Sequence, residues 1–131
     1  MFDPTDFLKV AEELSFATID EAKLRTSICR SYFYAFLFSR EWLKTNKGII
    51  FSNKVDDHKL AHNGLKKYVN RTTRDLLSNL RRNYRNEADY NLTITIQQKQ
   101  AKDAIVLAKQ IVNNIIILPS STTQGSSSSN P

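Results

Sequence analysis

The stretch from Asp20 to Asn46 constrains the fold most, because its centre, YFYAFLF at residues 32–38, is apolar on every side of a helix. A helix without a polar face has to be covered all round. Asp20 is a suitable N-cap, and Gly48 follows the predicted end, where glycine favours helix termination. In a chain of 131 residues, such a helix forms the centre of the core or also faces a second subunit.

The rest of the chain repeats apolar residues at helical spacing. We expect further helices at about 4–16, 58–69 and 97–117, a loop at 48–57, and a helix that is capped by Thr72 or Thr73 and ends near Tyr90. Three glycines and three prolines offer little material for the turns of an all-β fold. The sequence predicts an all-α, up-and-down four- to five-helix bundle over residues 1–118, followed by a disordered Ser-rich tail at 119–131.

The positive charge of the chain is concentrated in one segment. The formal net charge is +6. Between Lys59 and Arg85, eight Lys and Arg residues and one acid, Asp75, give eight minus one, or +7. A concentrated positive field attracts polyanions, so nucleic acid or nucleotide phosphate is the first partner to consider. A solvated basic face without a ligand is the alternative.

The predicted helix that ends near Tyr90 carries four arginines beside its core face. At about 100° per residue, the core face consists of Leu76, Leu77, Leu80, Tyr84 and Ala88. The adjoining arc contains Arg74, Arg81, Arg82 and Arg85. An arginine at the rim of a groove can hold a phosphate through two parallel hydrogen bonds. The alternative is that Arg82 and Arg85 only pair with Asp89, Glu87 or acids elsewhere, which adds about 0–1 kcal/mol at a surface.

His58 and His62 are four residues apart, a spacing that can hold a metal ion. The stretch HKLAH has Lys59 where the zinc motif HExxH has glutamate, and the chain has two histidines and one cysteine, Cys29. We therefore expect structural or solvated histidines, a core cysteine, no metal and no cofactor. The longest apolar run is too short to span a bilayer, and one cysteine suits a reducing compartment. We expect a cytoplasmic protein that is not associated with a membrane.

Several segments, in this order, resemble a HEPN domain: RTSICRSYFYAFLFSREWL, DHKLAHNGL, LRRNYRNEADYNL and the apolar final helix. The similarity covers about residues 5–117. Its most specific parts are Arg30-Ser31 ahead of the aromatic run and Arg-Asn-x-Ala-Asp-Tyr at 85–90. The resemblance implies a helical bundle that forms a homodimer with a shared polar cleft. Many such proteins are encoded beside a minimal nucleotidyltransferase in toxin–antitoxin or defence modules.

Active HEPN proteins are metal-independent ribonucleases whose motif is an arginine, a polar residue and then a histidine. On this chain the resemblance assigns Arg85 and Asn86 to the first two positions, but Tyr90 stands where the histidine is expected. RNA cleavage without metal needs a group that takes the 2′-hydroxyl proton. Histidine titrates near about 6.5 and tyrosine near about 10, so an unperturbed tyrosine is deprotonated about a thousandth of the time at neutral pH. Weak or absent catalysis is therefore expected.

Two functions from different classes follow. The first is a weakly catalytic or non-catalytic HEPN homodimer that binds RNA or nucleotide phosphate through Arg74, Arg81, Arg82 and Arg85 and works with a nucleotidyltransferase. The second is a ribonuclease toxin that cuts single-stranded RNA with Arg85, Asn86 and Tyr90 as catalytic residues. A helical interaction module without a ligand is the third option.

Overall fold

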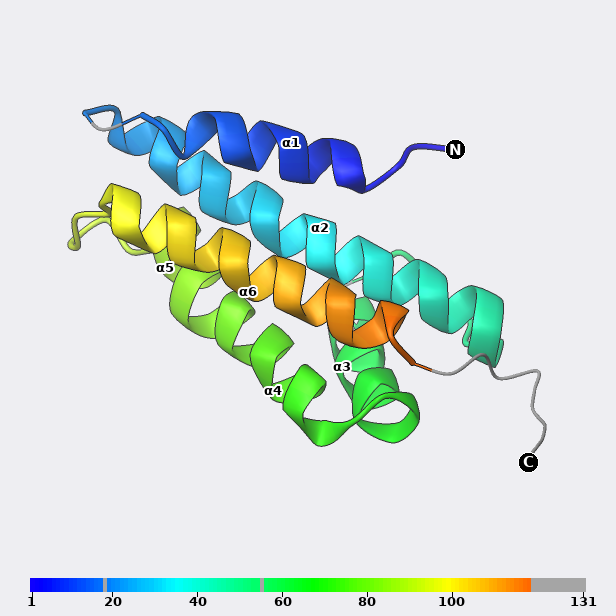
Figure 1. Ribbon diagram of the computed structural model, residues 1–131. Coiled ribbons are helices and arrows are strands. Elements are labelled where there is room, and N and C mark those ends of the chain that lie inside the picture. The colour runs from blue at the N-terminus through cyan, green and yellow to red at the C-terminus, as the bar shows by residue number, and fades with distance from the viewer. Residues whose placement is uncertain (18, 55, 119–131) are drawn as a thin grey trace.

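The computed structural model describes residues 1–17, 19–54 and 56–118, and every regular element in these ranges is a helix. In chain order (Figure 1), the elements are α1 (Thr5–Leu14), α2 (Glu21–Lys47), α3 (Asp57–Tyr68), α4 (Arg71–Asn79), η1 (Leu80–Arg85), α5 (Asn86–Tyr90) and α6 (Gln98–Ile116). The predicted all-α class is confirmed. The tail predicted to be disordered, 119–131, lies outside the described residues.

Helix α2 is the centre of the molecule and contacts every other described helical element. The predicted signals set its ends. The Asp20 carboxylate accepts a hydrogen bond from the backbone N–H of Lys23 at 3.2 Å, and Gly48 adopts a left-handed φ of 66°. Tyr32 in the middle of α2 is fully buried. Four residues of the apolar run are thus buried within a single chain, while three remain half-buried: Tyr32, Tyr34, Ala35 and Phe36 are buried, and Phe33, Leu37 and Phe38 are half-buried.

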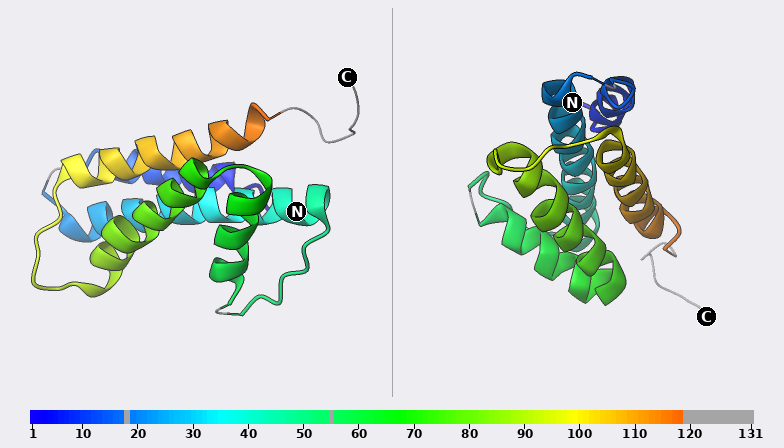
Figure 2. Two further views of the ribbon diagram at one scale, coloured as in Figure 1. Left: turned by 90° about the horizontal axis from the view of Figure 1, so that it is seen from below. Right: turned by 90° about the vertical axis from the view of Figure 1, so that its left-hand side faces the viewer.

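Helix α3 departs from the up-and-down order. Helices α1, α2 and α6 and the rod α4–η1–α5 run back and forth along one direction, whereas α3 crosses them steeply (Figure 2). The loop before α3 is folded back by Asp57, whose carboxylate accepts hydrogen bonds from the N–H and hydroxyl of Ser52 at 2.9 and 3.1 Å. The chain therefore returns along the flank of α2 and places α3 beside α4.

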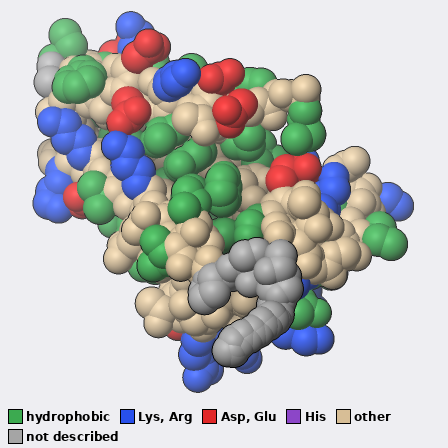
Figure 3. Space-filling model, turned by 45° about the vertical axis from the view of Figure 1, so that its right-hand side comes forward, with side chains coloured by type: hydrophobic (Ala, Val, Ile, Leu, Met, Phe, Trp, Pro, Cys, Tyr) green, Lys and Arg blue, Asp and Glu red, His purple; other side chains and the backbone are tan. Residues whose placement is uncertain are grey.

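The final helix packs as the sequence predicts. Its apolar face is buried at Ala101, Ala104, Ile105, Ala108, Ile111, Val112 and Ile115. A reciprocal pair of hydrogen bonds between Gln97 and Gln100 caps its start. On the face that Figure 3 shows, hydrophobic side chains gather in the middle and charged side chains lie around the edges. Within the described ranges, no helix combines the length and apolar character that a membrane span requires.

The predicted cap of the helix at 71–90 is wrong by two or three residues. Asn70, rather than Thr72 or Thr73, is the N-cap, and its side-chain oxygen accepts a hydrogen bond from the backbone N–H of Thr73 at 2.8 Å. The Thr73 side chain is buried, and its hydroxyl accepts a hydrogen bond from Asn114 of α6 at 3.1 Å. Thr73 thus joins two helices instead of starting one.

Candidate functional site

The helical rod that carries the arginines contains a π-helical segment. Segment η1 follows α4 and continues into α5 without a break, over the residues LRRNYR. A π-helix bonds each N–H to the carbonyl five residues back, so it winds more widely than an α-helix, and such segments recur at functional sites. The rod still buries Leu77, Leu80 and Ala88, as predicted, while Leu76 and Tyr84 are half-buried against the core.

Arg81 of η1 differs from the other predicted arginines in its surroundings. Its Nε atom is buried and has no hydrogen-bond partner among the described residues. Arg81 and Asn86 line two cavities of about 590 and 330 Å³, so the two cavities adjoin along η1. We call these the α5 cavity and the α3 cavity. A buried guanidinium N–H without a hydrogen-bond partner is rare in proteins.

The α5 cavity brings together the three residues predicted to be catalytic. Its lining consists of Arg81, Arg85, Asn86, Glu87, Tyr90 and Asn91. Tyr90 stands at the end of α5, and 70% of it is exposed. The Glu87 carboxylate accepts hydrogen bonds from the Asn91 amide at 3.3 and 3.4 Å, so the acid in this cavity is already engaged.

Arg85 is held in place within the protein. Its Nε atom donates to Asp89 at 3.0 Å, and its guanidinium lies 5.2 Å from the Phe33 ring centre and 5.9 Å from that of Tyr90. Only 15% of its side chain is exposed. The alternative that Arg85 pairs with Asp89 is therefore confirmed, and a phosphate at Arg85 has to compete with this carboxylate.

The other two predicted arginines are separated from this pair. Arg82 is exposed and lines the α3 cavity. Arg74 lies one α-helical segment earlier, and its Nε atom donates to Asp75 at 2.7 Å. Arg74 lines neither of the two cavities. The predicted set therefore divides into Arg81, Arg82 and Arg85 at the cavities and Arg74 outside them.

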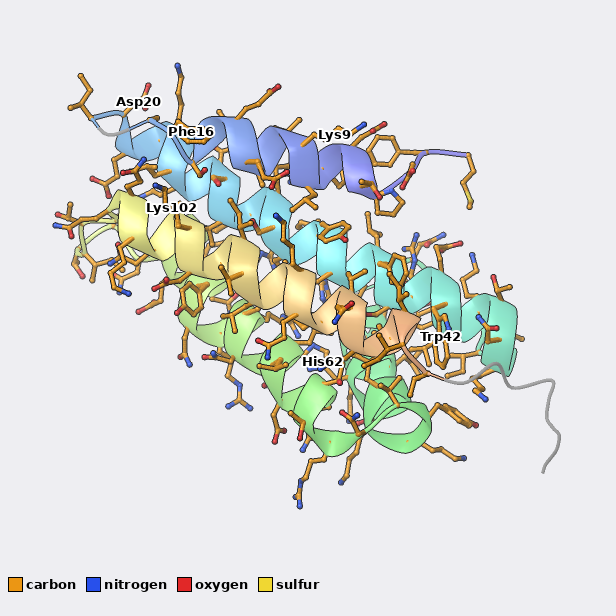
Figure 4. The ribbon with its side chains drawn as sticks, viewed as in Figure 1. Lys9, Phe16, Asp20, Trp42, His62 and Lys102 are labelled. Carbon is orange, nitrogen blue, oxygen red and sulfur yellow. The ribbon has the colours of Figure 1, made fainter. Side chains whose placement is uncertain are left out.

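The α3 cavity contains a histidine that sequence reasoning set aside. Its lining is Lys59, His62, Ser78, Arg81, Arg82 and Asn86, which includes no acid. His62 projects from α3 beside α4 (Figure 4). Its Nε2 atom is buried without a hydrogen-bond partner among the described residues. Burial, together with the positive charge of Arg81, lowers the pKa of His62 to about 4, so the ring is neutral at pH 7.

His58, one turn earlier, has the structural role that the sequence suggested. The Tyr32 hydroxyl lies 2.6 Å from its Nδ1 atom, and its ring stacks on Phe36 at 4.3 Å. Burial, with the charges of Arg81 and Arg85, lowers the pKa of His58 to about 4. The HKLAH spacing could have indicated that both histidines face one side of α3. Nothing local in the sequence indicated that this side faces η1.

Arg25 of α2 is a further residue that the sequence did not single out. Its Nη1 atom donates to the carbonyls of Ala88 and Asn91 at 2.9 and 3.0 Å, and its Nη2 atom donates to that of Ile94 at 2.7 Å. These carbonyls belong to the end of α5 and the turn after it, where the chain can no longer satisfy them itself. Arg25 therefore fixes the end of the helix that carries Asn86 and Tyr90.

One relative has a sequence clearly similar to this chain. It is the uncharacterized protein MJ0628 of Methanocaldococcus jannaschii, which is 35% identical over 122 residues, an alignment that covers 80% of this chain and 73% of the relative. The chain belongs to the family of this archaeal protein. No family model matches the chain, and no solved structure matches it significantly.

Proposed function

We propose that this protein is a HEPN-family protein that binds RNA or nucleotide phosphate at the two adjoining cavities, with weak or no catalysis. The observation that carries the proposal is the buried, unpaired Nε atom of Arg81 at the junction of the cavities. Arg82, Lys59 and Asn86 add donors on the α3 side. Guanidinium groups bind phosphate oxygens with directed, charge-assisted hydrogen bonds, which suits a nucleic-acid backbone.

The positive charges of Arg81, Arg82 and Lys59 support a ligand because no ion pair among the described residues neutralises them. Arg85 is neutralised by Asp89, but no salt bridge within the described ranges involves Arg81, Arg82 or Lys59. Like charges gathered without acids repel each other and destabilise a fold. A phosphate ligand would compensate for this repulsion.

The test is binding of a fluorescently labelled single-stranded RNA, measured by anisotropy. Arg81→Gln should weaken binding by about 1.5–3 kcal/mol, the usual contribution of a hydrogen bond to a charged group. Arg71→Gln is the matched control, because Arg71 is an exposed arginine that lies on the same rod and lines neither cavity. Equal affinity in wild type and Arg81→Gln would exclude this site as the binding surface.

A metal-independent ribonuclease is the second candidate, and the meeting of Arg85, Asn86 and Tyr90 in the α5 cavity favours it. In this version Arg85 stabilises the charge that develops on the phosphate, Asn86 positions it and Tyr90 takes the 2′-hydroxyl proton. The Arg85–Asp89 ion pair counts against it, because it offsets the charge that such a reaction uses. Cleavage of single-stranded RNA in EDTA that Tyr90→Phe removes would establish the ribonuclease. If wild type and Tyr90→Phe both fail to cleave the RNA, the ribonuclease is excluded and only the binding function remains.

We also propose that the protein forms a homodimer and works with a minimal nucleotidyltransferase in a toxin–antitoxin or defence module. Helix α2 supports the dimer, because Phe33 and Leu37 remain only half-buried after all described helices have packed. Light scattering at micromolar concentration should give twice the mass of the chain, and a monomer would refute the dimer. A small nucleotidyltransferase gene beside this one would support the module.

A further inference from the structure

The α3 cavity is lined by hydrogen-bond donors, cations and one titratable ring, and it has no acid in its lining. We propose that this cavity holds one phosphate of the bound strand and that His62 takes up a proton as the phosphate enters. The inference rests on the proposed RNA binding and adds to it a second subsite and a coupled proton. The proton comes from solvent, and no bond other than N–H is made or broken.

The first support is the pair of unsatisfied nitrogens. The Nε2 atom of His62 and the Nε atom of Arg81 are both buried, and neither has a partner among the described residues. Buried polar groups are nearly always paired in folded proteins. A neutral His62 offers an acceptor through that nitrogen or a donor through it, depending on the tautomer, whereas a protonated His62 donates through both ring nitrogens. A phosphate oxygen can then accept from His62 and Arg81 together.

The second support is the charge around the ring. From η1, Arg81 and Arg82 face His62. From α4, Arg74 acts on it, and from α3 itself, His58 does so. Lys59 shares the cavity with it. Burial is the largest cause that lowers the pKa of His62, and the neighbouring positive charges lower it further.

An anion in the cavity reverses part of that effect. It supplies the negative charge that the lining lacks, and so it favours the imidazolium. A neighbouring opposite charge shifts a pKa by about 1–3 units. The pKa of His62 is about 4 without ligand. A rise of about two units on binding would bring it to about 6 in the complex.

Affinity then depends on pH in a defined window. Above about pH 7 His62 is neutral in both states, and binding takes up almost no proton. Between the bound and free values only the complex is protonated, so the affinity rises as the pH falls. With a two-unit rise, linkage gives about tenfold tighter binding at pH 5 than at pH 8, with about 0.8 proton taken up per strand at pH 5.

The experiment uses the full chain and a labelled uridine decamer, whose phosphodiesters and bases do not titrate between pH 5 and 8. Anisotropy at constant ionic strength should show about a tenfold gain in affinity from pH 8 to pH 5. Calorimetry at pH 5 in two buffers of different ionisation enthalpy should show the proton uptake. The His62→Gln variant should bind with the same affinity at pH 5 and pH 8. The Lys59→Gln variant should bind more weakly than wild type at both pH values but keep the increase in affinity from pH 8 to pH 5.

A direct readout is the NMR titration of the His62 ring in wild type, free and bound, which does not depend on the folding of any variant. The pKa should rise on binding. A strand that binds with an unchanged His62 pKa and a flat pH profile would overturn the inference and leave the proposed function intact. A strand that does not bind at low salt at either pH would overturn both.

Discussion

Replacing Arg25 of α2 should cost more stability than a single surface ion pair would suggest, because its side chain is mostly buried. The side chain donates three hydrogen bonds of 2.7–3.0 Å to carbonyls at the end of α5 and in the turn beyond it, and it is 17% exposed. Each hydrogen bond to a charged group contributes about 1.5–3 kcal/mol. The three share one guanidinium and water can replace some of them, so we expect Arg25→Met to lower the free energy of unfolding by about 3 kcal/mol.

For a chain of this size that loss corresponds to a fall in Tm of about 10–15 °C. Arg25→Lys keeps the charge but cannot reach several carbonyls at once, so about half of the loss is expected. Thermal unfolding followed by circular dichroism measures both, and Lys23→Met, an exposed change on the same helix, should shift Tm by only about 2 °C. Hydrogen exchange should quicken first in residues 86–96. A Tm for Arg25→Met within about 2 °C of wild type would refute this role.

Three further outcomes are expected. Asp89→Asn releases Arg85 from its ion pair, so single-stranded RNA should bind several-fold tighter in anisotropy, and weaker binding would contradict the competition argument. Asn70→Ala removes the N-cap of α4 and should cost about 1 kcal/mol in urea unfolding. Because the pKa values of His58 and His62 are lowered from 6.5 to about 4, the unfolded chain binds more protons, and Tm should fall as the pH falls from about 6.5 toward 4; a Tm that rises over this range would contradict the depressed values.

Local signals were sufficient to predict the longest helices. Asp20 and Gly48 set the ends of α2 because capping depends on a few neighbouring residues. The apolar spacing in 97–117 identified the whole buried face of α6 because that helix is regular. The cap at Asn70 was missed because a threonine hydroxyl can equally serve a distant partner, as Thr73 does with Asn114.

The candidate site was predictable only in part. The arginine cluster and the grouping of Arg85 with Asn86 and Tyr90 follow from neighbours on one helix. The π-helical winding of η1 gives no periodic signal in six residues, so the sequence could not predict it. The meeting of His62 with Arg81 depends on how steeply α3 crosses the bundle, which is a property of packing.

The central claim is that the cavities along η1 bind the phosphates of RNA, and the salt dependence of binding tests it most directly. Three phosphate contacts predict a slope of about −2 in a plot of log affinity against log salt for a single strand, which is about a fifteenfold loss between 50 and 200 mM. Arg81→Gln should make the slope shallower by about 0.7, while Arg71→Gln should leave it near the wild-type value. No binding at 50 mM salt, or a slope that Arg81→Gln leaves unchanged, would contradict the account.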